Sequence, residues 1–448
     1  MPPAEEYIAS QRDRFIEELQ VFARQPSVAA TGEGIAAMAA LVKGRLEQLG
    51  AIVQQIPTGG APIVYAELGG GPHTLLIYNH YDVQPPDPID LWTTPPFEPS
   101  VRDGKLYARG ISDDKGDLLC RIHGIEMWQR TIGPLPLKIK WVIEGEEEVG
   151  SPHLAEFARN FAAMLQADGC LWETGGKNEE DRVTLTMGLK GIQYLELRAH
   201  GAQRDLHSGY AAIAPSPVWR LIWALNTLKD QNDNILIDNY YDYVRAPSDA
   251  EIAMLRAMPF NEARKKATLG IDRFINDEHG LDVLKRLYYG PTVTLCGIQA
   301  GYTGAGMKTV LPNTAFAKID CRLVPNLTPE RCVALLRTHL DKRGFSDIEI
   351  APLCGEHPAL SPVDSPVVKA CQAAARKVYG DDPVMIPLST GSGPMYPLTT
   401  ALGIPTVMAG ITYADSRAHA PDENIRLSDY FEGILFIGQL IDRFAASP

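Results

Sequence analysis

Side chains able to bind metal ions stand at widely separated positions in this chain. They are His80, Asp113, Glu148, Glu173 and His419, and they are spread over about 340 residues. Four of them follow short apolar runs, directly or after a few intervening residues, and such runs are the pattern of strands that are buried on both faces. Histidine nitrogens and carboxylate oxygens of this kind would suit two metal ions that activate water for hydrolysis.

The elements expected in the first part of the chain explain how such distant residues could meet. The apolar runs at 75–78, 139–143 and 170–172 predict strands, and residues 117–130 predict a helix between two of them. This alternation indicates an α/β sheet with right-handed crossovers, whose ligand sites lie beyond the carboxyl ends of its strands. The candidate ligands fall at those ends.

A second domain is expected to begin near residue 192, because residues 194–200 alternate as a strand with one wet face does. Further elements follow in the order helix, strand, helix, strand, at 217–229, 314–323, from 329 to before Gly344, and 348–350. A helix that opens at Ser365 and Pro366 and a buried strand at 404–409 then return the chain to the first domain. We therefore expect one domain from 1–191 and 356–448, with 192–355 inserted into it.

Composition excludes several classes of partner. The formal net charge is -13, and no basic stripe is present that would bind nucleic acid or an anionic membrane. The amino terminus is acidic where a signal peptide is basic, and no apolar run approaches the length of a membrane span, so we expect a cytoplasmic protein. The seven cysteines show no Cys-x-x-Cys spacing and are expected to be buried free thiols.

Local spacing suggests how some of these residues act. Side chains alternate along an extended segment, so Asp82 can lie behind His80 and fix its tautomer. Asp113 stands just before a predicted helix, where its two oxygens could bridge two cations. The run 146–148 places three carboxylates after a strand, which indicates either a cation site or a solvated acidic turn. A His-x-Asp pair alone is more often structural.

Taken together, the motifs resemble the dizinc peptidase family of carnosinases, aminoacylases, carboxypeptidase G and succinyl-diaminopimelate desuccinylase. The carnosinase-like cytosolic dipeptidases look nearest. The matching segments, in order, are HYDVQP at 80–85, DGKLY at 103–107, RGISDDKG at 109–116, EGEEEVGS at 144–151, DLHSG at 205–209, KTVLP at 308–312, RLVPN at 322–326 and AH at 418–419. Their order along essentially the whole chain makes a chance match very improbable.

The resemblance implies an α/β catalytic domain of the zinc-peptidase type with a central mixed sheet, and an inserted α+β lid or dimerisation domain. It assigns His80, Asp113 and Glu173 to one metal and Asp113, Glu148 and His419 to the other. Two zinc ions are expected, although manganese or cobalt would also suit these ligands. Glu147 would be the general base for a water that bridges the metals, Asp82 would orient His80, and a cis peptide would follow Asp113.

In the inserted domain the resemblance implies residues that handle the substrate. His207 would stabilise the oxyanion across the interface of a homodimer formed through this domain. Arg322 would clamp the substrate's free carboxylate, with other substrate contacts nearby. Those other contacts are Thr309, Asn313, Ser392 and Gly393.

The substrate class stays open between two branches of the family. Carnosinase-like dipeptidases usually carry aspartate where this chain has Glu173, whereas glutamate is commoner in the deacylase and carboxypeptidase branches. We therefore expect hydrolysis of a small peptide, as a dipeptidase or carboxypeptidase, with an N-acyl-amino-acid deacylase as the alternative. A noncatalytic binding paralogue is a further alternative, but Glu147 and all five ligand positions carry competent residues.

Overall fold

The computed structural model describes residues 2–447, which form two compact units. The first unit runs to Gly188, resumes at residues 360–387 and continues from Pro394. The second comprises Leu189–Ala359 and the short loop Leu388–Gly393. The chain passes between the units at β10 (Gly188–Leu189) and β17 (Ala359–Leu360). Within the described residues, no helix has both the length and the apolar character needed to cross a membrane.

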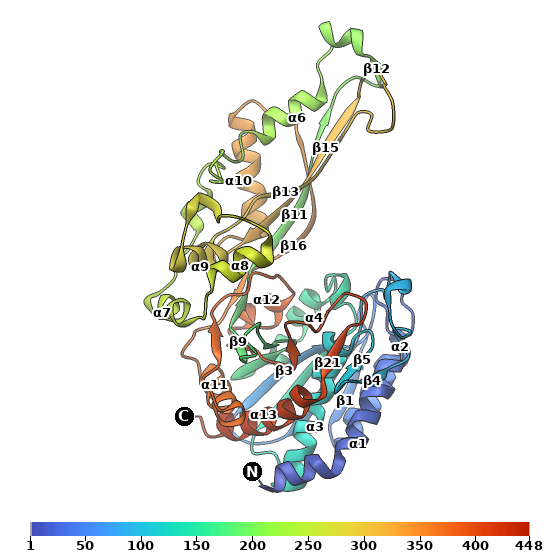
Figure 1. The fold of residues 1–448 in the computed structure, drawn as a ribbon, viewed down its shortest axis with the longest axis vertical. Helices are drawn as coiled ribbons and strands as arrows, with labels where there is room; N and C mark the ends of the chain where they lie inside the picture. The colour runs from blue at the N-terminus through green and yellow to red at the C-terminus, as the bar shows by residue number, and fades with distance from the viewer. Residues whose placement is uncertain (1, 448) are drawn as a thin grey trace. The chain divides into compact units, whose positions relative to one another are not determined.

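An eight-stranded mixed sheet forms the centre of the first unit (Figure 1). Its strands, in spatial order, are β1 (Ile52–Ile56), β2 (Ile63–Gly69), β6 (Lys138–Glu144), β3 (Thr74–His80), β7 (Gly169–Trp172), β19 (Thr406–Met408), β9 (Thr184–Thr186) and β18 (Val384–Ile386). β3, β6 and β7 are parallel, and β19 runs parallel to β7. β1, β2 and β6 pair antiparallel, so the expected mixed sheet is confirmed.

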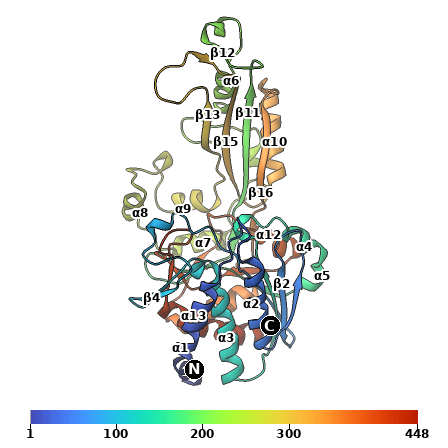
Figure 2. The ribbon, with the colours of Figure 1, turned by 90° about the vertical axis from the view of Figure 1, so that its right-hand side faces the viewer.

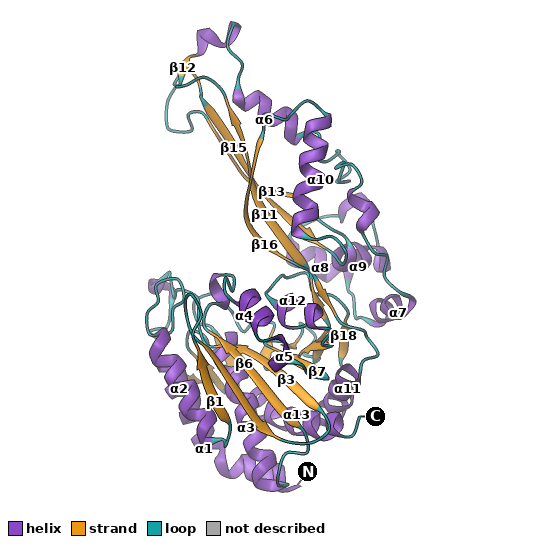
Figure 3. Ribbon diagram, turned by 180° about the vertical axis from the view of Figure 1, so that it is seen from behind, coloured by secondary structure: helices purple, strands orange, loops and turns teal. Residues whose placement is uncertain are grey.

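Helices cover this sheet, and the longest of them pack on one another (Figure 3). The helices of the first unit are α1 (Pro2–Arg24), α2 (Ile35–Gln48), α3 (Gly116–Thr131), α4 (Leu154–Asn160), α5 (Ala162–Leu165), α11 (Pro366–Tyr379), α12 (Met395–Leu398) and α13 (Leu427–Ala445). α3 follows the segment of Asp113, and most of its residues are buried. Small sheets lie beside the main one, formed by β4 (Ser100–Arg102), β5 (Lys105–Tyr107) and β21 (Asn424–Arg426), and by β8 (Gly176–Lys177) and β20 (Thr412–Tyr413).

The second unit is built on a four-stranded antiparallel sheet in the order β13 (Thr294–Ala300), β15 (Thr314–Leu323), β11 (Gly191–His200) and β16 (Glu349–Glu356) (Figure 2). α6 (Pro217–Leu225) and α10 (Pro329–Lys342) pack on one face of this sheet. The core lies there, because alternate side chains of the strands, such as Leu197 and Ile319, are buried together with helix residues such as Leu336 of α10. β12 (Leu206–His207) and β14 (Val310–Leu311) form a separate pair.

Three parts of the second unit differ from the sequence-based expectation. α6 ends at Leu225, four residues before the expected end, and β16 begins one residue late and continues to Glu356. β13 was not predicted, because an edge strand with an irregular register near Gly297 lacks the alternation that marks a half-buried strand. By contrast, the segment from about 230 to 290 is a helical insertion, as the sequence predicts, with α7 (Asp249–Ala257), α8 (Glu262–Leu269) and α9 (Gly280–Tyr289).

The cysteine prediction is only partly right. All seven cysteines are free, and five are buried. Cys296 and Cys354 are exposed, and they lie on the two edge strands of the second unit's sheet, β13 and β16.

Candidate metal centre

The strands of the first unit bring the predicted ligands to one edge of the sheet. His80 is the last residue of β3, and the parallel strands β6 and β7 end at Glu144 and Trp172. Glu147 and Glu148 follow on a 3-10 turn, and Glu173 directly follows β7. Because parallel strands end at the same edge, side chains from three separate segments meet there.

Asp113 lies between the two histidines. Its Oδ1 is 2.9 Å from His80 Nε2, and its Oδ2 is 3.2 Å from His419 Nε2. Glu148 Oε2 lies 3.1 Å from the same His419 nitrogen, and Glu173 Oε2 lies 3.8 Å from His80 Nε2. One carboxylate therefore offers a separate oxygen to each side of the cluster, which is the geometry that a bridging ligand requires.

Asp82 holds both sides of this arrangement in place. His80 Nδ1 lies 3.1 Å from the Asp82 carbonyl oxygen and 3.4 Å from its carboxylate, which favours a proton on Nδ1 and leaves Nε2 for a metal. The Asp82 carboxylate also accepts hydrogen bonds from the backbone N–H groups of Glu147 and Glu148, at 3.3 and 3.0 Å. A single buried carboxylate thus orients a histidine and the turn that carries two glutamates.

The donor set fits metal ions. Among the described residues, two groups place one ligand atom each within 4.8 Å of one another: His80 with Asp114 and Glu173, and His80 with Asp113 and Glu148. Glu173 Oε2 and Asp114 Oδ1 are buried without a hydrogen-bond partner in the described chain. A buried carboxylate oxygen without a partner is unfavourable unless a cation lies beside it. The sequence analysis did not single out Asp114, although its place beside Asp113 was a usable signal.

The electrostatics of the cluster are those of crowded carboxylates. Burial and the charges of Asp113 and Glu148 raise the pKa of Glu147 to about 8, against the effect of His80. Burial and the charge of Glu147 raise the pKa of Glu173 well above its usual value. Burial also opposes ionisation of Asp113, but hydrogen bonds with His419 and His80 lower its pKa. This excess of negative charge is what divalent cations would balance.

The pKa of His419 is shifted by carboxylates of the same cluster. Its hydrogen bonds with Asp113 and Glu148 raise its pKa to about 10. Its side chain is half exposed, unlike that of His80, which is fully buried. Gln84 donates to Glu148 Oε2 at 2.8 Å and to the Glu148 carbonyl oxygen at 3.1 Å, so the carboxylate that faces His419 is itself oriented.

The peptide bond from Asp113 to Asp114 is cis, which confirms the expectation drawn from the family resemblance. A second cis bond joins Asp87 to Pro88. The segment Ile111–Lys115 is a single irregular turn, in which Asp113 has non-helical dihedral angles (φ -142°, ψ 89°).

Two buried charged residues that were not predicted from the sequence, Arg121 and Glu423, support the cluster. Arg121 of α3 donates to the carbonyl oxygens of Tyr78 and Trp172, each at 2.6 Å, near the ends of β3 and β7. Glu423 accepts hydrogen bonds from the segment that carries Asp113. Neither position carries a sequence signal, because an arginine on a helix and a glutamate on a loop are both ordinary surface residues by type.

In the second unit, Arg322 lies at the end of β15 with its guanidinium oriented by neighbours. Its Nε and Nη2 each lie 3.2 Å from an oxygen of Asp320, and its Nη1 donates to Ser392 Oγ at 2.9 Å. Gly393 is on the same loop as Ser392. Lys190 donates to the backbone carbonyl oxygens of Leu287 and Gly290, and burial together with the charge of Arg322 lowers its pKa to about 8.

His207, Thr309 and Asn313 lie at the other end of the same strand. β15 pairs with β11 from Arg322 opposite Ile192 to Thr314 opposite His200. Eight residues of strand at about 3.3 Å each correspond to roughly 26 Å. The structure therefore separates Thr309 and Asn313 from Arg322 within one chain, whereas the sequence analysis placed them nearby.

The geometry of His207 leaves one ring nitrogen available as a donor. Its Nδ1 accepts a hydrogen bond from the backbone N–H of Gly209 at 3.1 Å. In the neutral ring the proton is then on Nε2. Ser208 N donates to the Thr309 carbonyl oxygen at 3.1 Å, and Asp205 Oδ1 accepts from Asn313 N at 3.0 Å, so the three residues belong to one connected group.

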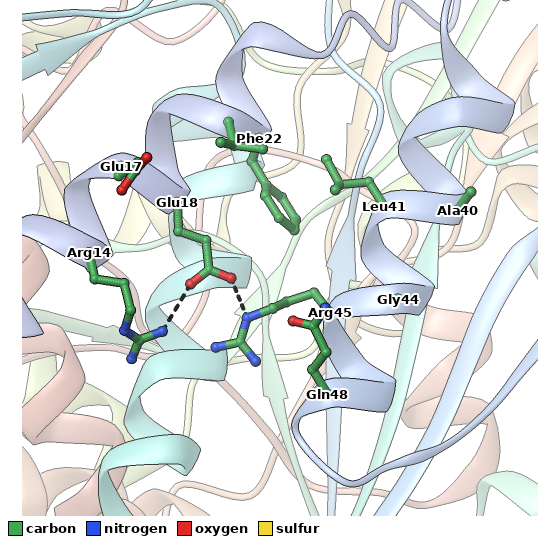
Figure 4. A pocket seen from close by; sticks show the side chains of 10 residues that line it. Arg14, Glu17, Glu18, Phe22, Ala40, Leu41, Gly44, Arg45 and Gln48 are labelled. Carbon is green, nitrogen blue, oxygen red and sulfur yellow. Dashed lines mark hydrogen bonds and ion pairs between the residues drawn. The ribbon is translucent and has the colours of Figure 1, made fainter.

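A cavity of about 450 Å³ elsewhere in the first unit lies between α1 and α2 (Figure 4). Arg45 and Arg14 both pair with Glu18 beside it. His123 Nε2 donates to the same carboxylate at 2.7 Å, and Tyr430 donates to His123 Nδ1. None of the metal-cluster residues lines this cavity, so we assign it no part in the chemistry.

Comparisons with known proteins agree with this geometry. The model of Peptidase family M20/M25/M40 matches residues 76–443. The structure of an M20 family metallo-carboxypeptidase, Sso-CP2 from Sulfolobus solfataricus, is 37% identical with a TM-score of 0.90, covering 96% of this chain and 99% of that one. The di-peptidase Dug1p from Saccharomyces cerevisiae is 25% identical with a TM-score of 0.83, covering 100% and 99%. Beta-Ala-His dipeptidase of Homo sapiens is 28% identical, covering 96% of this chain and 89% of that protein. The resemblance inferred from the motifs is confirmed.

Proposed function

Because this chain belongs to peptidase family M20/M25/M40 and is a metal-dependent peptidase, we propose that it hydrolyses dipeptides and other short peptides that end in a free carboxylate. The observation that carries the proposal is the convergence of two histidines and several carboxylates, from segments more than 300 residues apart, around Asp113. The relatives are named as dipeptidases and a metallo-carboxypeptidase, which supports peptides over N-acyl amino acids.

We assign His80, Asp113 and Glu173 to one cation and Asp113, Glu148 and His419 to the other. The two Asp113 oxygens, each facing a different histidine, support this division. Zinc is the proposed metal, because histidine and carboxylate sets of this kind favour it, and manganese or cobalt would be accepted less specifically. Two bound cations would polarise the scissile carbonyl and lower the pKa of a water molecule.

Glu147 is the proposed general base. It stands beside Glu148, but among the described residues no ion pair joins its carboxylate to His80 or His419, so we propose that it transfers protons and is not a ligand. A carboxylate whose pKa is raised towards neutrality accepts a proton from the attacking water and can then give it to the leaving amine. Asp82 accepts hydrogen bonds from the backbone N–H groups of Glu147 and Glu148, and it thereby fixes the direction in which the Glu147 side chain points.

Arg322 is the proposed binding residue for the substrate's carboxylate. Asp320 and Ser392 hold its guanidinium through three N–H groups. Arginine has five such donors, so donors remain for a bidentate contact. Both dipeptidases and carboxypeptidases need this contact, because both act on a peptide with a free carboxyl end.

We further propose a homodimer formed through the second unit. A dipeptide is far shorter than the roughly 26 Å of strand that separates His207, Thr309 and Asn313 from Arg322. One chain therefore cannot direct both groups at the same substrate. A partner subunit would supply His207, whose Nε2 proton suits it to stabilise a developing oxyanion.

The surface available for such a dimer is apolar. Trp219 and Trp223 of α6 are 57% and 56% exposed and stack on each other, and Leu295 and Ile298 on β13 are half exposed. α6 packs on β15, whose outer neighbour is the edge strand β13. Large apolar side chains beside an unpaired strand edge are characteristic of an interface between protein chains.

The decisive experiment compares wild type with Glu147→Gln after the metal has been removed and zinc, manganese or cobalt restored. Wild type should bind two metal ions per chain and release amino acids from dipeptides. Glu147→Gln should bind both ions and lose turnover by about 10²–10⁴-fold, since it removes proton transfer only. If the variant keeps near-normal kcat, Glu147 is not the base, and if wild type turns over no substrate with any metal, the chain is a binding paralogue.

A substrate panel separates the remaining classes. Free dipeptides, dipeptides blocked at the amino end and N-acetyl amino acids should be offered to the same zinc enzyme. Cleavage of free dipeptides alone indicates a dipeptidase, and cleavage of the blocked peptides indicates a carboxypeptidase. Preference for the N-acyl amino acids would favour the alternative function, an N-acyl-amino-acid deacylase, which the glutamate at position 173 suggests. The cytoplasmic location stays a prediction from the amino-terminal sequence.

A further inference from the structure

Glu423 lies on the same loop as His419, four residues further along the chain, and only 1% of it is exposed. Both of its carboxylate oxygens are used. Oε2 accepts hydrogen bonds from Arg109 Nη1 at 2.7 Å and from Gly110 N at 2.9 Å. Oε1 accepts from Ser112 N at 2.8 Å, from Ser112 Oγ at 2.9 Å and from Asp113 N at 3.2 Å. One side chain therefore holds five donors, all from the segment that ends at Asp113.

These contacts join two segments that are more than 300 residues apart. The first carries Asp113, and the second carries His419, whose Nε2 lies 3.2 Å from Asp113 Oδ2. The strand pair β5 and β21 joins the two segments up to Ala108 N, which donates to the Glu423 carbonyl oxygen at 3.1 Å, but it does not extend to Asp113 or His419. The turn at Asp113 has irregular dihedral angles, and His419 has a positive φ of 60°. The Glu423 carboxylate supplies the hydrogen bonds that a helix or sheet would otherwise provide.

Arg109 compensates the buried negative charge of the Glu423 carboxylate. Its guanidinium is 1% exposed, donates to the Pro85 carbonyl oxygen as well as to Glu423, and lies 5.3 Å from the Trp92 ring. A buried, hydrogen-bonded ion pair holds its members in one geometry, because displacing either partner leaves an uncompensated charge. The ion pair and hydrogen bonds of Glu423 therefore hold the two segments rigidly against each other.

We infer that Glu423 is a positioning residue, which sets Asp113 against His419 and so determines how tightly the cluster binds metal. This inference rests on the proposed function, since it concerns the same two ligands. Glu423 touches no ligand side chain. It acts through the backbone N–H of Asp113 and through the short connection to His419, as the outer partners of metal ligands commonly do.

The test is Glu423→Gln, which preserves size and one oxygen. The amide could still accept the three Ser112 and Asp113 hydrogen bonds, but its NH2 group would face the Arg109 and Gly110 donors. The matched control is Glu18→Gln, because Glu18 is another mostly buried carboxylate paired with a buried arginine, Arg45, in the same unit and outside the cluster. Zinc affinity is measured by competition with a chelator, together with the Tm of each protein without and with zinc.

We expect Glu423→Gln to bind zinc about 10–100-fold more weakly than wild type. The rise in Tm that zinc produces should shrink accordingly, since that rise follows the metal's affinity. Glu18→Gln should lower the Tm of the metal-free protein but keep wild-type zinc affinity. Equal zinc affinity in Glu423→Gln and wild type would overturn the inference, whatever the loss of Tm.

A milder variant keeps the inference testable if Glu423→Gln does not fold. Ser112→Ala removes one of the five donors and no charge, so it should fold and weaken zinc binding by about 2–10-fold. Unchanged zinc affinity in Ser112→Ala would contradict the positioning role of Glu423. Failure of wild type itself to bind two metal ions would refute the proposed function, so the wild-type titration and the variant-to-wild-type ratio answer separate questions.

Discussion

Replacing Arg121 should destabilise the first unit more than replacing any exposed arginine. Its guanidinium is 1% exposed and donates to the carbonyl oxygens of Tyr78 and Trp172 at 2.6 Å, to Asn79 Oδ1 at 2.8 Å and to the Ala409 carbonyl oxygen at 3.2 Å. The three carbonyls lie at or just beyond the ends of β7 and β19 and near the end of β3. Arg121 therefore holds the ends of three strands together at the sheet edge that carries the candidate metal ligands.

The magnitude follows from the acceptors that would be left without a donor. Arg121→Met removes the donor from the carbonyl oxygens of Tyr78, Trp172 and Ala409, whereas Asn79 Oδ1 still accepts from Trp141 Nε1. Each buried carbonyl left without this donor costs about 1–2 kcal/mol, for a total of about 3–6 kcal/mol. Arg121→Lys keeps the charge and can still reach some of these oxygens, so it should lose about half as much. At about 2–4 °C per kcal/mol for a unit of this size, the expected fall in Tm is roughly 6–24 °C for Met and roughly 3–12 °C for Lys.

The assay is thermal unfolding of the metal-free protein, so that metal binding does not contribute. The matched control is Arg443→Met on α13, because Arg443 is 46% exposed and its ion pair with Asp442 spans 3.8 Å. That change should alter stability by less than about 0.5 kcal/mol. If Arg121→Met melts within about 1 °C of Arg443→Met, the guanidinium does not hold the strand ends and the reasoning is wrong.

Three further outcomes are expected. Arg322→Ala should raise KM for dipeptides and leave zinc content unchanged, whereas an unaltered kcat/KM would refute the carboxylate contact. Trp219→Glu should give a monomer in sedimentation that binds zinc normally but turns over slowly, because it lacks the partner's His207, and a fully active monomer would contradict the dimer. Glu18 is buried, yet His123 and Arg45 hold its pKa near 2, below the ordinary 4.5. The Tm advantage of wild type over Glu18→Gln should therefore be complete above pH 4.5 and disappear as the pH falls towards 2, and a pH-independent difference would refute the ion pairs.

Much of the first unit's fold follows from local sequence. The buried runs ending near His80, Glu144 and Trp172 are strands, the helix expected at 117–130 is α3, and α11 begins at Pro366 as expected. These elements are determined by residues close in sequence, because burial on both faces and helix capping leave local patterns. The edge strand β13 has no such pattern in its sequence, since it pairs with only one neighbouring strand, β15.

The candidate ligands could also be named from sequence, because their types and motifs are local properties. The sequence alone determined that His80, Asp113, Glu148, Glu173 and His419 have the chemistry of metal ligands and stand at the ends of predicted elements. Their distances to one another were decided by the tertiary structure.

Only the tertiary structure decided which ordinary residues support those ligands. Arg121 and Glu423 act on backbone groups of segments from about 40 to more than 300 residues away, so no nearby residue reports their roles. The same holds for the separation of His207 from Arg322, which depends on the register and length of β15. A hydrogen bond depends on where two atoms lie in space, and for distant segments that position exists only once the chain has folded.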